Sequence, residues 1–160
     1  MPSPKYPLKT LLEHRERKVD AATAELGDAA RAREAADAAR ARAELERRGA
    51  EERASRVRAE ESARLARGQL SAADLARGRA WELAASAEIT ELDRAVARAE
   101  KSVERAREVE AGARAELAQR TADRDVIVKD ETRFGDRLKG RALAAEEEAA
   151  EEAARARRRA

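Results

Sequence analysis

Few residues in this chain have the type and spacing that catalysis or metal binding requires. His14 is the only histidine, and it stands between charged residues on a helical face that we expect to be exposed. No serine, cysteine or aspartate is arranged to activate it as a nucleophile or base. The chain contains no cysteine, which excludes disulfides and thiolate metal sites, and its seven glycines are scattered singly, which excludes a phosphate-binding loop. We therefore predict a protein that is not an enzyme and that binds no metal and no cofactor.

The residue best suited to recognition is Trp81, the only tryptophan in the chain. Tryptophan is enriched among the residues that anchor protein complexes, and in a thin helical structure it cannot be wholly buried. Alternatively, Trp81 packs over Leu65 and Leu75 and locks that part of the chain. The two roles are compatible, and the sequence leaves both open.

The composition excludes an ordinary globular core. Charged residues make up 42% of the chain and aromatic residues 2%, and much of the 42% that is apolar is alanine. The 35 basic and 33 acidic side chains are interleaved along the sequence, as in Glu13 with Arg17, and the net charge is only +2. Alanine, arginine and glutamate are strong helix formers, and pairs of opposite charge four residues apart support a helix. The composition thus favours long exposed helices.

Apolar residues recur every seven positions in each half of the chain. Two alternating rows of this spacing form a narrow seam along one side of a helix, and that seam needs a partner helix. We therefore predict an all-α fold, a long antiparallel two-helix coiled-coil hairpin. The rows are Leu12, Val19 and Leu26 beside Arg15, Ala22, Ala29, Ala36 and Ala43, and Ile89, Val96 and Val103 beside Leu92, Ala99, Ala106 and Ala113.

Local signals set the expected boundaries of a single hairpin over residues 1–160. Pro7 suits the first helical position, and Gly68 can adopt the left-handed conformation that closes a helix. Ser71 and Asp74 resemble a capping box at the start of a second helix. We expect a first helix over about 7–67, a turn at 68–72 and a second helix over about 73–158.

The second helix should extend beyond its partner from about residue 141 onward. Acidic residues precede basic ones in this overhang, which agrees with the helix dipole. It is either a solvated helix end or a docking element. At the same end of the hairpin, Tyr6 and Phe134 form an aromatic pair that either clamps the helix ends together or contacts a partner. The charged residues of the overhang are Glu146, Glu147, Glu148, Glu151, Glu152, Arg155, Arg157, Arg158 and Arg159.

Several segments resemble the FliJ/YscO (SctO) family, the central stalk proteins of type III export ATPases. The resemblance covers nearly the whole chain. It rests on Tyr6-Pro7-Leu8-Lys9-Thr10-Leu11-Leu12, on the turn Leu70-Ser71-Ala72-Ala73-Asp74-Leu75, on Arg79-Ala80-Trp81-Glu82-Leu83, and on the charged tail after Arg133-Phe134.

This resemblance implies a non-enzymatic stalk protein of a flagellar or type III secretion export apparatus. Such a stalk inserts into a hexameric export ATPase, stimulates it, and contacts the cytoplasmic domain of the export gate protein. The family is also implicated in recycling export chaperones. The implied gate contacts at the tip are Leu75, Trp81, Leu83 and Ile89. The implied ATPase contacts at the terminal end are Tyr6, Leu8, Leu12, Phe134, Leu138 and Leu143.

The sequence also bears on location. Residues 1–7 contain no apolar run of the kind found in secretory signals. No stretch of about 18 apolar residues occurs, which argues against direct membrane insertion. We expect a cytoplasmic protein, and the resemblance implies a peripheral position at the inner-membrane export apparatus.

Two other interpretations fit parts of the sequence. A generic coiled-coil adaptor or scaffold protein of another bacterial assembly would share the same heptad pattern, and an extended parallel dimer would make residues 68–74 a flexible break. A nucleic-acid or membrane-surface helix would rely on the arginines at 155–159. The interleaved acids and the lack of an aromatic-studded basic strip argue against nucleic acid.

Overall fold

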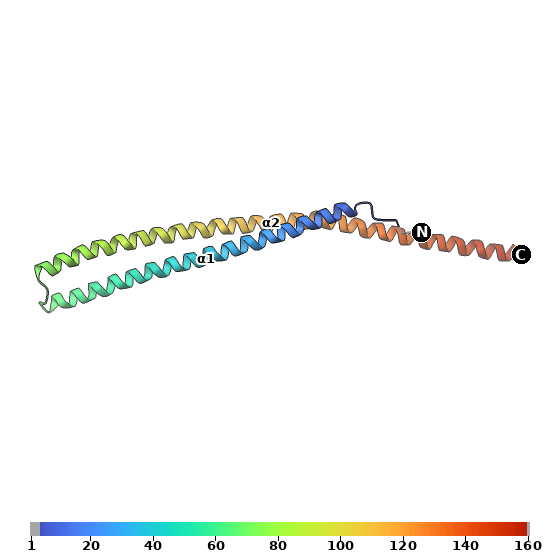
Figure 1. The fold of residues 1–160 in the computed structure, drawn as a ribbon. Coiled ribbons are helices and arrows are strands. Elements are labelled where there is room, and N and C mark those ends of the chain that lie inside the picture. The colour runs from blue at the N-terminus through green and yellow to red at the C-terminus, as the bar shows by residue number, and fades with distance from the viewer. Residues whose placement is uncertain (1–3, 160) are drawn as a thin grey trace. The chain divides into compact units, whose positions relative to one another are not determined.

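The computed structural model describes residues 4–159, which form two long α-helices and no strand. Helix α1 spans Lys9–Ala66 and helix α2 spans Ala72–Arg159 (Figure 1). The all-α hairpin predicted from the heptad rows is confirmed. Alanine, arginine and glutamate dominate both helices, so their local propensities agree with the fold.

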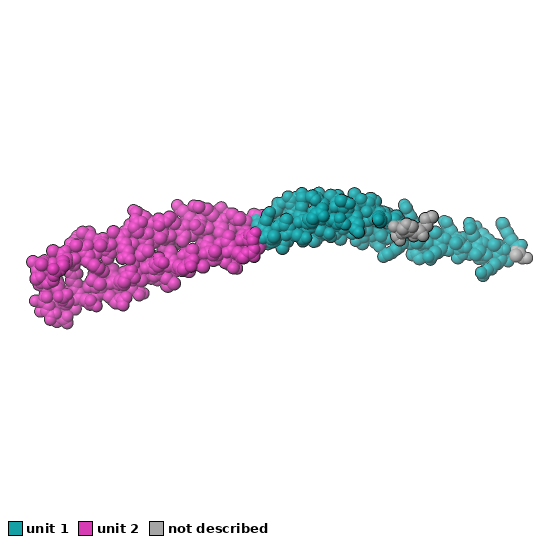
Figure 2. All heavy atoms as spheres, in the orientation of Figure 1, with its two compact units in different colours: residues 1–26, 113–160 teal, residues 27–112 magenta. Residues whose placement is uncertain are grey.

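The chain divides into two compact units, and each contains a part of both helices (Figure 2). Unit 1 comprises residues 1–26 and 113–160, of which 4–26 and 113–159 are described, and unit 2 comprises residues 27–112. Within each unit the helix segments run antiparallel, because contacts that move forward along α1 move backward along α2. In unit 2 the ion pairs are Arg33–Glu110, Arg47–Asp93 and Arg53–Glu88, and in unit 1 Tyr6 contacts Asp130 while Arg15 pairs with Asp123.

The buried residues are few and small, as a two-helix seam requires. In unit 1 they are Leu12 and Ala22, and in unit 2 they are Ala29, Ala50, Ala54 and Val103. All but Ala50 and Ala54 belong to the rows predicted from the sequence, and these two continue the same rows at intervals of seven. Alanine at most of these positions allows the two helix axes to approach closely.

Arginines interrupt the seam in unit 2. The row that begins at Leu12 continues every seven residues to Arg33, Arg40 and Arg47, and all three are half-buried. Nε of Arg33 lies 2.7 Å from a carboxylate oxygen of Glu110 on α2. Since half-buried charges need partners, this ion pair replaces the apolar contact that the heptad pattern leads one to expect there.

The link between the helices has the predicted geometry. Gly68 has φ of 66°, the left-handed conformation, and its N–H donates to the carbonyl of Leu65 at 2.9 Å. The N–H of Gln69 donates to the carbonyl of Arg64 at 3.0 Å, and these two bonds together make a Schellman motif. The motif ends α1 at Ala66.

Helix α2 begins with the predicted capping box. The N–H of Asp74 donates to Oγ of Ser71 at 3.2 Å, and the N–H of Ser71 donates to Oδ2 of Asp74 at 2.9 Å. These bonds from Ser71, together with Arg77, hold the pKa of the Asp74 carboxyl well below its usual range. Asp in place of Glu therefore still closes the box.

The start of α1 differs slightly from the expectation. Pro7 and Leu8 form a turn, and the helix begins at Lys9 rather than near residue 7. The N–H of Leu12 donates to the carbonyl of Leu8 at 2.9 Å, which places Leu8 immediately before the first helical residue. A difference of two residues at a helix end is common.

A candidate docking surface around Trp81

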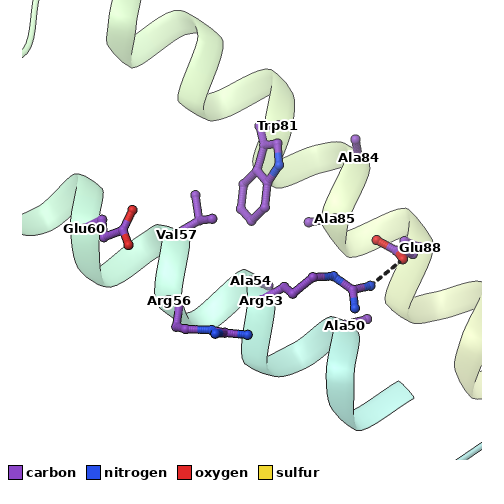
Figure 3. A pocket seen from close by; sticks show the side chains of 10 residues that line it. All are labelled: Ala50, Arg53, Ala54, Arg56, Val57, Glu60, Trp81, Ala84, Ala85 and Glu88. Atoms are coloured by element: carbon purple, nitrogen blue, oxygen red, sulfur yellow. Dashed lines mark hydrogen bonds and ion pairs between the residues drawn. The ribbon is translucent and has the colours of Figure 1, made fainter. Parts of the chain in front are cut away.

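Trp81 lies on α2 in unit 2, and its side chain points toward α1 (Figure 3). It is 37% exposed, so it is neither buried in the seam nor free of it. Two facing residues of α1, Ala54 and Val57, line the same hollow. The small side chain of Ala54 leaves room for the indole, and Val57 supplies an apolar contact surface beside it.

The largest hollow beside Trp81 has a volume of about 500 Å³. Its floor is apolar and its rim is charged, with Arg53 and Glu88 joined by an ion pair of 3.0 Å across the two helices. Apolar surface bordered by satisfied charges is typical of a protein-binding patch. The lining residues are Ala50, Arg53, Ala54, Arg56, Val57, Glu60, Trp81, Ala84, Ala85 and Glu88.

Two further hollows share Trp81 as a wall. One, of about 310 Å³, extends along α2 past Leu83 and Ile89. The other, of about 290 Å³, extends toward the turn and is lined by Leu70 and Gly78. Trp81 thus borders three hollows, and its exposed part is available to a partner side chain. We call the residues that line these three hollows the Trp81 surface.

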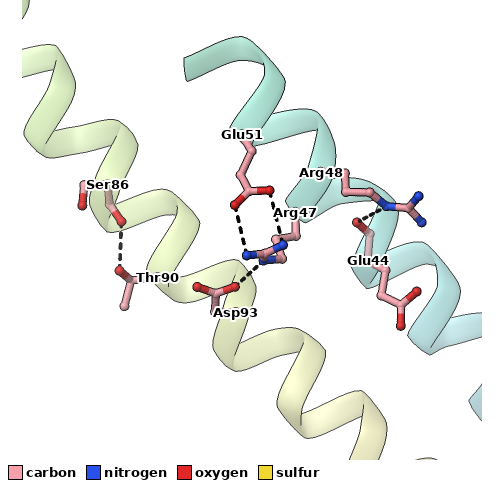
Figure 4. A network of polar contacts seen from close by, with 7 residues as sticks. All are labelled: Glu44, Arg47, Arg48, Glu51, Ser86, Thr90 and Asp93. Carbon is pink, nitrogen blue, oxygen red and sulfur yellow. Dashed lines mark hydrogen bonds and ion pairs between the residues drawn. The ribbon is translucent and has the colours of Figure 1, made fainter. Parts of the chain in front are cut away.

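A polar cluster lies between the two helices of unit 2 (Figure 4). Arg47 bonds to Asp93 on α2 and lies 3.0 Å from a carboxylate oxygen of Glu51 on its own helix. The bond to Asp93, with the charges of Asp93 and Glu51, raises the pKa of Arg47. Its side chain thereby ties α1 to α2 at a position where an apolar residue would otherwise stand.

The aromatic pair predicted at the terminal end forms within unit 1. The rings of Tyr6 and Phe134 are tilted at 56° with centroids 5.5 Å apart, and the Tyr6 hydroxyl donates to Oδ2 of Asp130 at 2.7 Å. Partial burial, followed by that bond to Asp130, raises the pKa of Tyr6 to about 12. These contacts are those of a clamp that holds the N-terminal segment on α2.

The predicted site residues differ in how exposed their side chains are. At the tip Leu75, Trp81 and Leu83 are exposed and Ile89 is half-buried, and Trp81, Leu83 and Ile89 line one hollow. Val57 lines two of the hollows beside Trp81, whereas Leu65 and Leu75 line none of the three. Packing of Trp81 over Leu65 and Leu75 stays a prediction.

At the terminal end, Leu12 is only 8% exposed and belongs to the helix–helix seam. It offers little surface to another protein. Tyr6, Phe134 and Leu138 are half-buried, whereas Leu8 and Leu143 are exposed. Of the six residues implied at this end, Leu143 therefore presents the most apolar surface, being 60% exposed.

The α1 side of the Trp81 surface was missing from the sequence-based site. The sequence contains a signal for the α1 side, because one heptad row of α1 continues at intervals of seven to Ala50 and Val57. In an antiparallel hairpin, residues at similar distances from the turn face each other, and this rule places Val57 within about one helical turn of the position opposite Trp81.

The residues suited to catalysis or metal binding remain dispersed. His14 is exposed on α1. Within residues 4–159 no three histidine, cysteine, aspartate or glutamate side chains come close enough to hold a metal ion. Neither helix, over its described length, is apolar enough to cross a membrane.

Comparisons with known proteins add no relative. No family model, no curated protein and no solved structure matches the chain.

Proposed function

We propose that this protein is a stalk protein of a type III export apparatus, flagellar or secretory. It inserts one end into a hexameric export ATPase, stimulates ATP hydrolysis, and contacts the cytoplasmic domain of the export gate with the other end. The site it supplies is a binding surface, and no residue of the chain takes part in the chemistry of hydrolysis. It works in the cytoplasm, at the periphery of the inner membrane.

The observation that supports this proposal is the antiparallel hairpin, together with the Trp81 surface in unit 2 and the aromatic clamp in unit 1. Three of the segments that resemble the family coincide with distinct structural features: Tyr6-Pro7-Leu8 with the aromatic clamp, residues 70–75 with the capped turn, and residues 79–83 with the Trp81 surface. The charged tail coincides with the exposed end of α2.

A helix pair of this kind can act on an ATPase ring without any catalytic residue. Six identical subunits surrounding one asymmetric pair of helices contact it unequally, so the pair favours different states in different subunits. The bias can be no larger than the differential affinity of the helix pair for those states. Exposed apolar residues such as Leu143 are the groups that can supply such a difference.

The terminal contact is tested by ATPase stimulation with purified hexameric export ATPase from the same bacterium. Leu143→Ala should weaken stimulation, and deletion of residues 143–160 should weaken it further while the hairpin stays folded. The matched control is Leu45→Ala, since Leu45 and Leu143 are leucines of nearly equal exposure, 61% and 60%. Unchanged stimulation by the deletion variant would count against the assignment of this end to the ATPase.

The tip contact is tested by binding to the cytoplasmic domain of the export gate. Trp81→Ala combined with Leu83→Ala should abolish binding without lowering helicity, because both side chains line the same hollow. Leu45→Ala again serves as the control, since its exposure equals that of Leu83 at 61%. Retained binding by the double variant would refute the tip assignment.

A co-purification experiment from the native bacterium decides between this function and a scaffold of another assembly. The proposal predicts that a hexameric ATPase is recovered with the tagged protein. Recovery of a different assembly, with no ATPase, would favour the scaffold.

A further inference from the structure

The last part of α2 has no partner among the described residues, 4–159. Every residue from 141 to 159 is exposed, although all of them are helical (Figure 1). We call residues 141–159 the tail. It continues α2 without a break, but it lacks the packing that supplies most of the stability of helices in proteins. A second helix lying against the tail would supply that packing.

The charges of the tail are separated into two blocks. Its acidic block is residues 146–152 and its basic block is residues 155–159, and with Arg141 the two signs balance. Among the described residues, the one ion pair in the tail joins Arg155 to Glu151 at 3.1 Å. The other charged side chains of both blocks therefore remain available to a partner. They are Glu146, Glu147, Glu148, Glu152, Arg157, Arg158 and Arg159.

The same segment has one uncharged face. Its alanines recur at i, i+3, i+7, i+11 and i+14, a spacing that places them on one side of a helix. Glu146 and Arg157 border this face on one side, and Glu148, Glu152, Arg155 and Arg159 border it on the other. A face of alanines permits two helices to approach closely. The alanines are Ala142, Ala145, Ala149, Ala153 and Ala156.

We infer that the tails of two copies of this chain pair antiparallel, alanine face to alanine face, about a two-fold axis near Ala153. In that register Glu146 of one copy lies beside Arg157 of the second copy. Glu148 and Glu152 likewise lie beside the basic block of the second copy. Two-fold symmetry forms each contact twice, as in any isologous interface.

Charge complementarity selects the antiparallel arrangement over the parallel one. In a parallel pair each acidic block would lie against the acidic block of the other copy, and the basic blocks would also meet. Like charges on neighbouring helices destabilise a pair, and opposite charges at flanking positions set orientation and partner choice. The overlap covers residues 146–159 on each copy, which is about 20 Å at the helical rise. An exposed interface this short, held partly by charges, forms a weak dimer that salt dissociates.

The first experiment measures self-association of the full-length chain by sedimentation velocity over a range of protein and salt concentrations. We expect a monomer–dimer equilibrium whose dissociation constant rises at least tenfold between low and high salt. A full-length variant with Arg155, Arg157, Arg158 and Arg159 changed to Glu should be monomeric. A second variant with its five tail glutamates changed to Lys should also be monomeric, and an equimolar mixture of the two should form a one-to-one dimer.

The second experiment tests the orientation through cross-linking, since the chain has no cysteine of its own. Full-length Glu146→Cys and full-length Arg157→Cys are mixed and oxidised. Antiparallel tails should yield a mixed disulfide between positions 146 and 157 in excess over either symmetric disulfide. Predominance of the symmetric 146–146 and 157–157 products would overturn the antiparallel arrangement.

A chain that stays monomeric up to about 1 mM, the range of the weakest specific complexes, would overturn the inference. A dimer that persists in both charge-reversed variants would also overturn it, because another surface would then hold the copies together. The tail is also the segment assigned to the ATPase, so pairing and insertion compete for it, and ATPase stimulation is measured separately at concentrations where the chain is monomeric. A monomeric chain that fails to stimulate the ATPase would contradict the proposed function and leave the tail pairing intact.

Discussion

Val103 provides a direct test of the seam, because it is the most deeply buried large side chain in the described part of the chain, at 2% exposure. Val103→Ala removes two carbon groups from the helix–helix contact, which costs about 1.6 kcal/mol at roughly 0.8 kcal/mol per buried CH₂. Alanine is the better helix former by up to about 0.7 kcal/mol, which offsets part of this loss. The free energy of unfolding should therefore fall by about 1 kcal/mol.

Val109→Ala is the matched control for this substitution. Val109 lies six residues further along the same helix and is 62% exposed. The gain in helix propensity is the same, and the loss of buried surface is about a third as large, so its stability should change by less than about 0.5 kcal/mol.

The assay is urea unfolding followed by far-UV circular dichroism. With a slope of about 2 kcal/mol per molar urea, the two variants should differ in midpoint by about 0.5 M. Equal stability of the two variants would refute the burial of Val103 against α1, and with it the seam.

Three further predictions concern the turn and the clamp. Gly68→Ala should lower the free energy of unfolding by about 1 kcal/mol, because Gly68 has φ of 66°, a conformation that is strained for alanine. Gly112→Ala, at a helical position with open space around it, should raise the free energy of unfolding by a similar amount. A rise at both positions in urea unfolding would contradict the left-handed turn. Ser71→Ala should cost about 1 kcal/mol at neutral pH and should raise the pKa of Asp74 in NMR titrations. Since the folded pKa of Asp74 lies below its ordinary value of 3.8, the stability that it contributes is present above that pH and lost as pH falls. An unchanged pKa in Ser71→Ala would contradict the capping box. Tyr6 is the only tyrosine, and its pKa in the folded chain should be about 12 when measured by ultraviolet absorbance. Because this pKa is raised above its ordinary value of 10.0, the stability that the Tyr6 hydroxyl contributes should be lost as pH rises from 10 through 12. An ordinary pKa of Tyr6 in the folded chain would contradict the clamp.

The helices and the turn could be predicted from the sequence because their signals are local. The heptad rows specify which face of each helix needs a partner, and Gly68 with Ser71 and Asp74 specifies where one helix ends and the next begins. Each of these signals acts within a few residues along the chain, so one sequence is sufficient to recognise it.

The half-buried arginines of the seam were not predicted. Arg33 and Arg47 occupy positions that the heptad pattern assigns to apolar residues, and they are accommodated because Glu110 and Asp93 on α2 accept their charge. The partner lies dozens of residues away in the sequence, so composition and periodicity alone do not reveal it. Continuing the Leu12 row at intervals of seven reaches Arg33, which shows that a charged residue occupies a seam position there.

The candidate site, too, was predicted only in part. Trp81, Tyr6 and Phe134 were recognised from the sequence because each is the only residue of its type in the chain. What surrounds Trp81 depends on the register of two helices, since Ala54 and Val57 come from α1. Leu12 is buried in the helix–helix seam because its heptad row faces α2. The family resemblance implied that Leu12 contacts a partner, but a resemblance does not show which residues are buried.

The most direct test of the hairpin is the separation of nitroxide labels at positions 53 and 88, which lie 35 residues apart and whose native side chains meet at 3.0 Å. Both positions are exposed, so labelling them disturbs no packing. The account predicts strong dipolar broadening that persists when the doubly labelled chain is diluted into excess unlabelled chain. Labels about 50 Å apart, as in one uninterrupted helix, or broadening that disappears on dilution would contradict it.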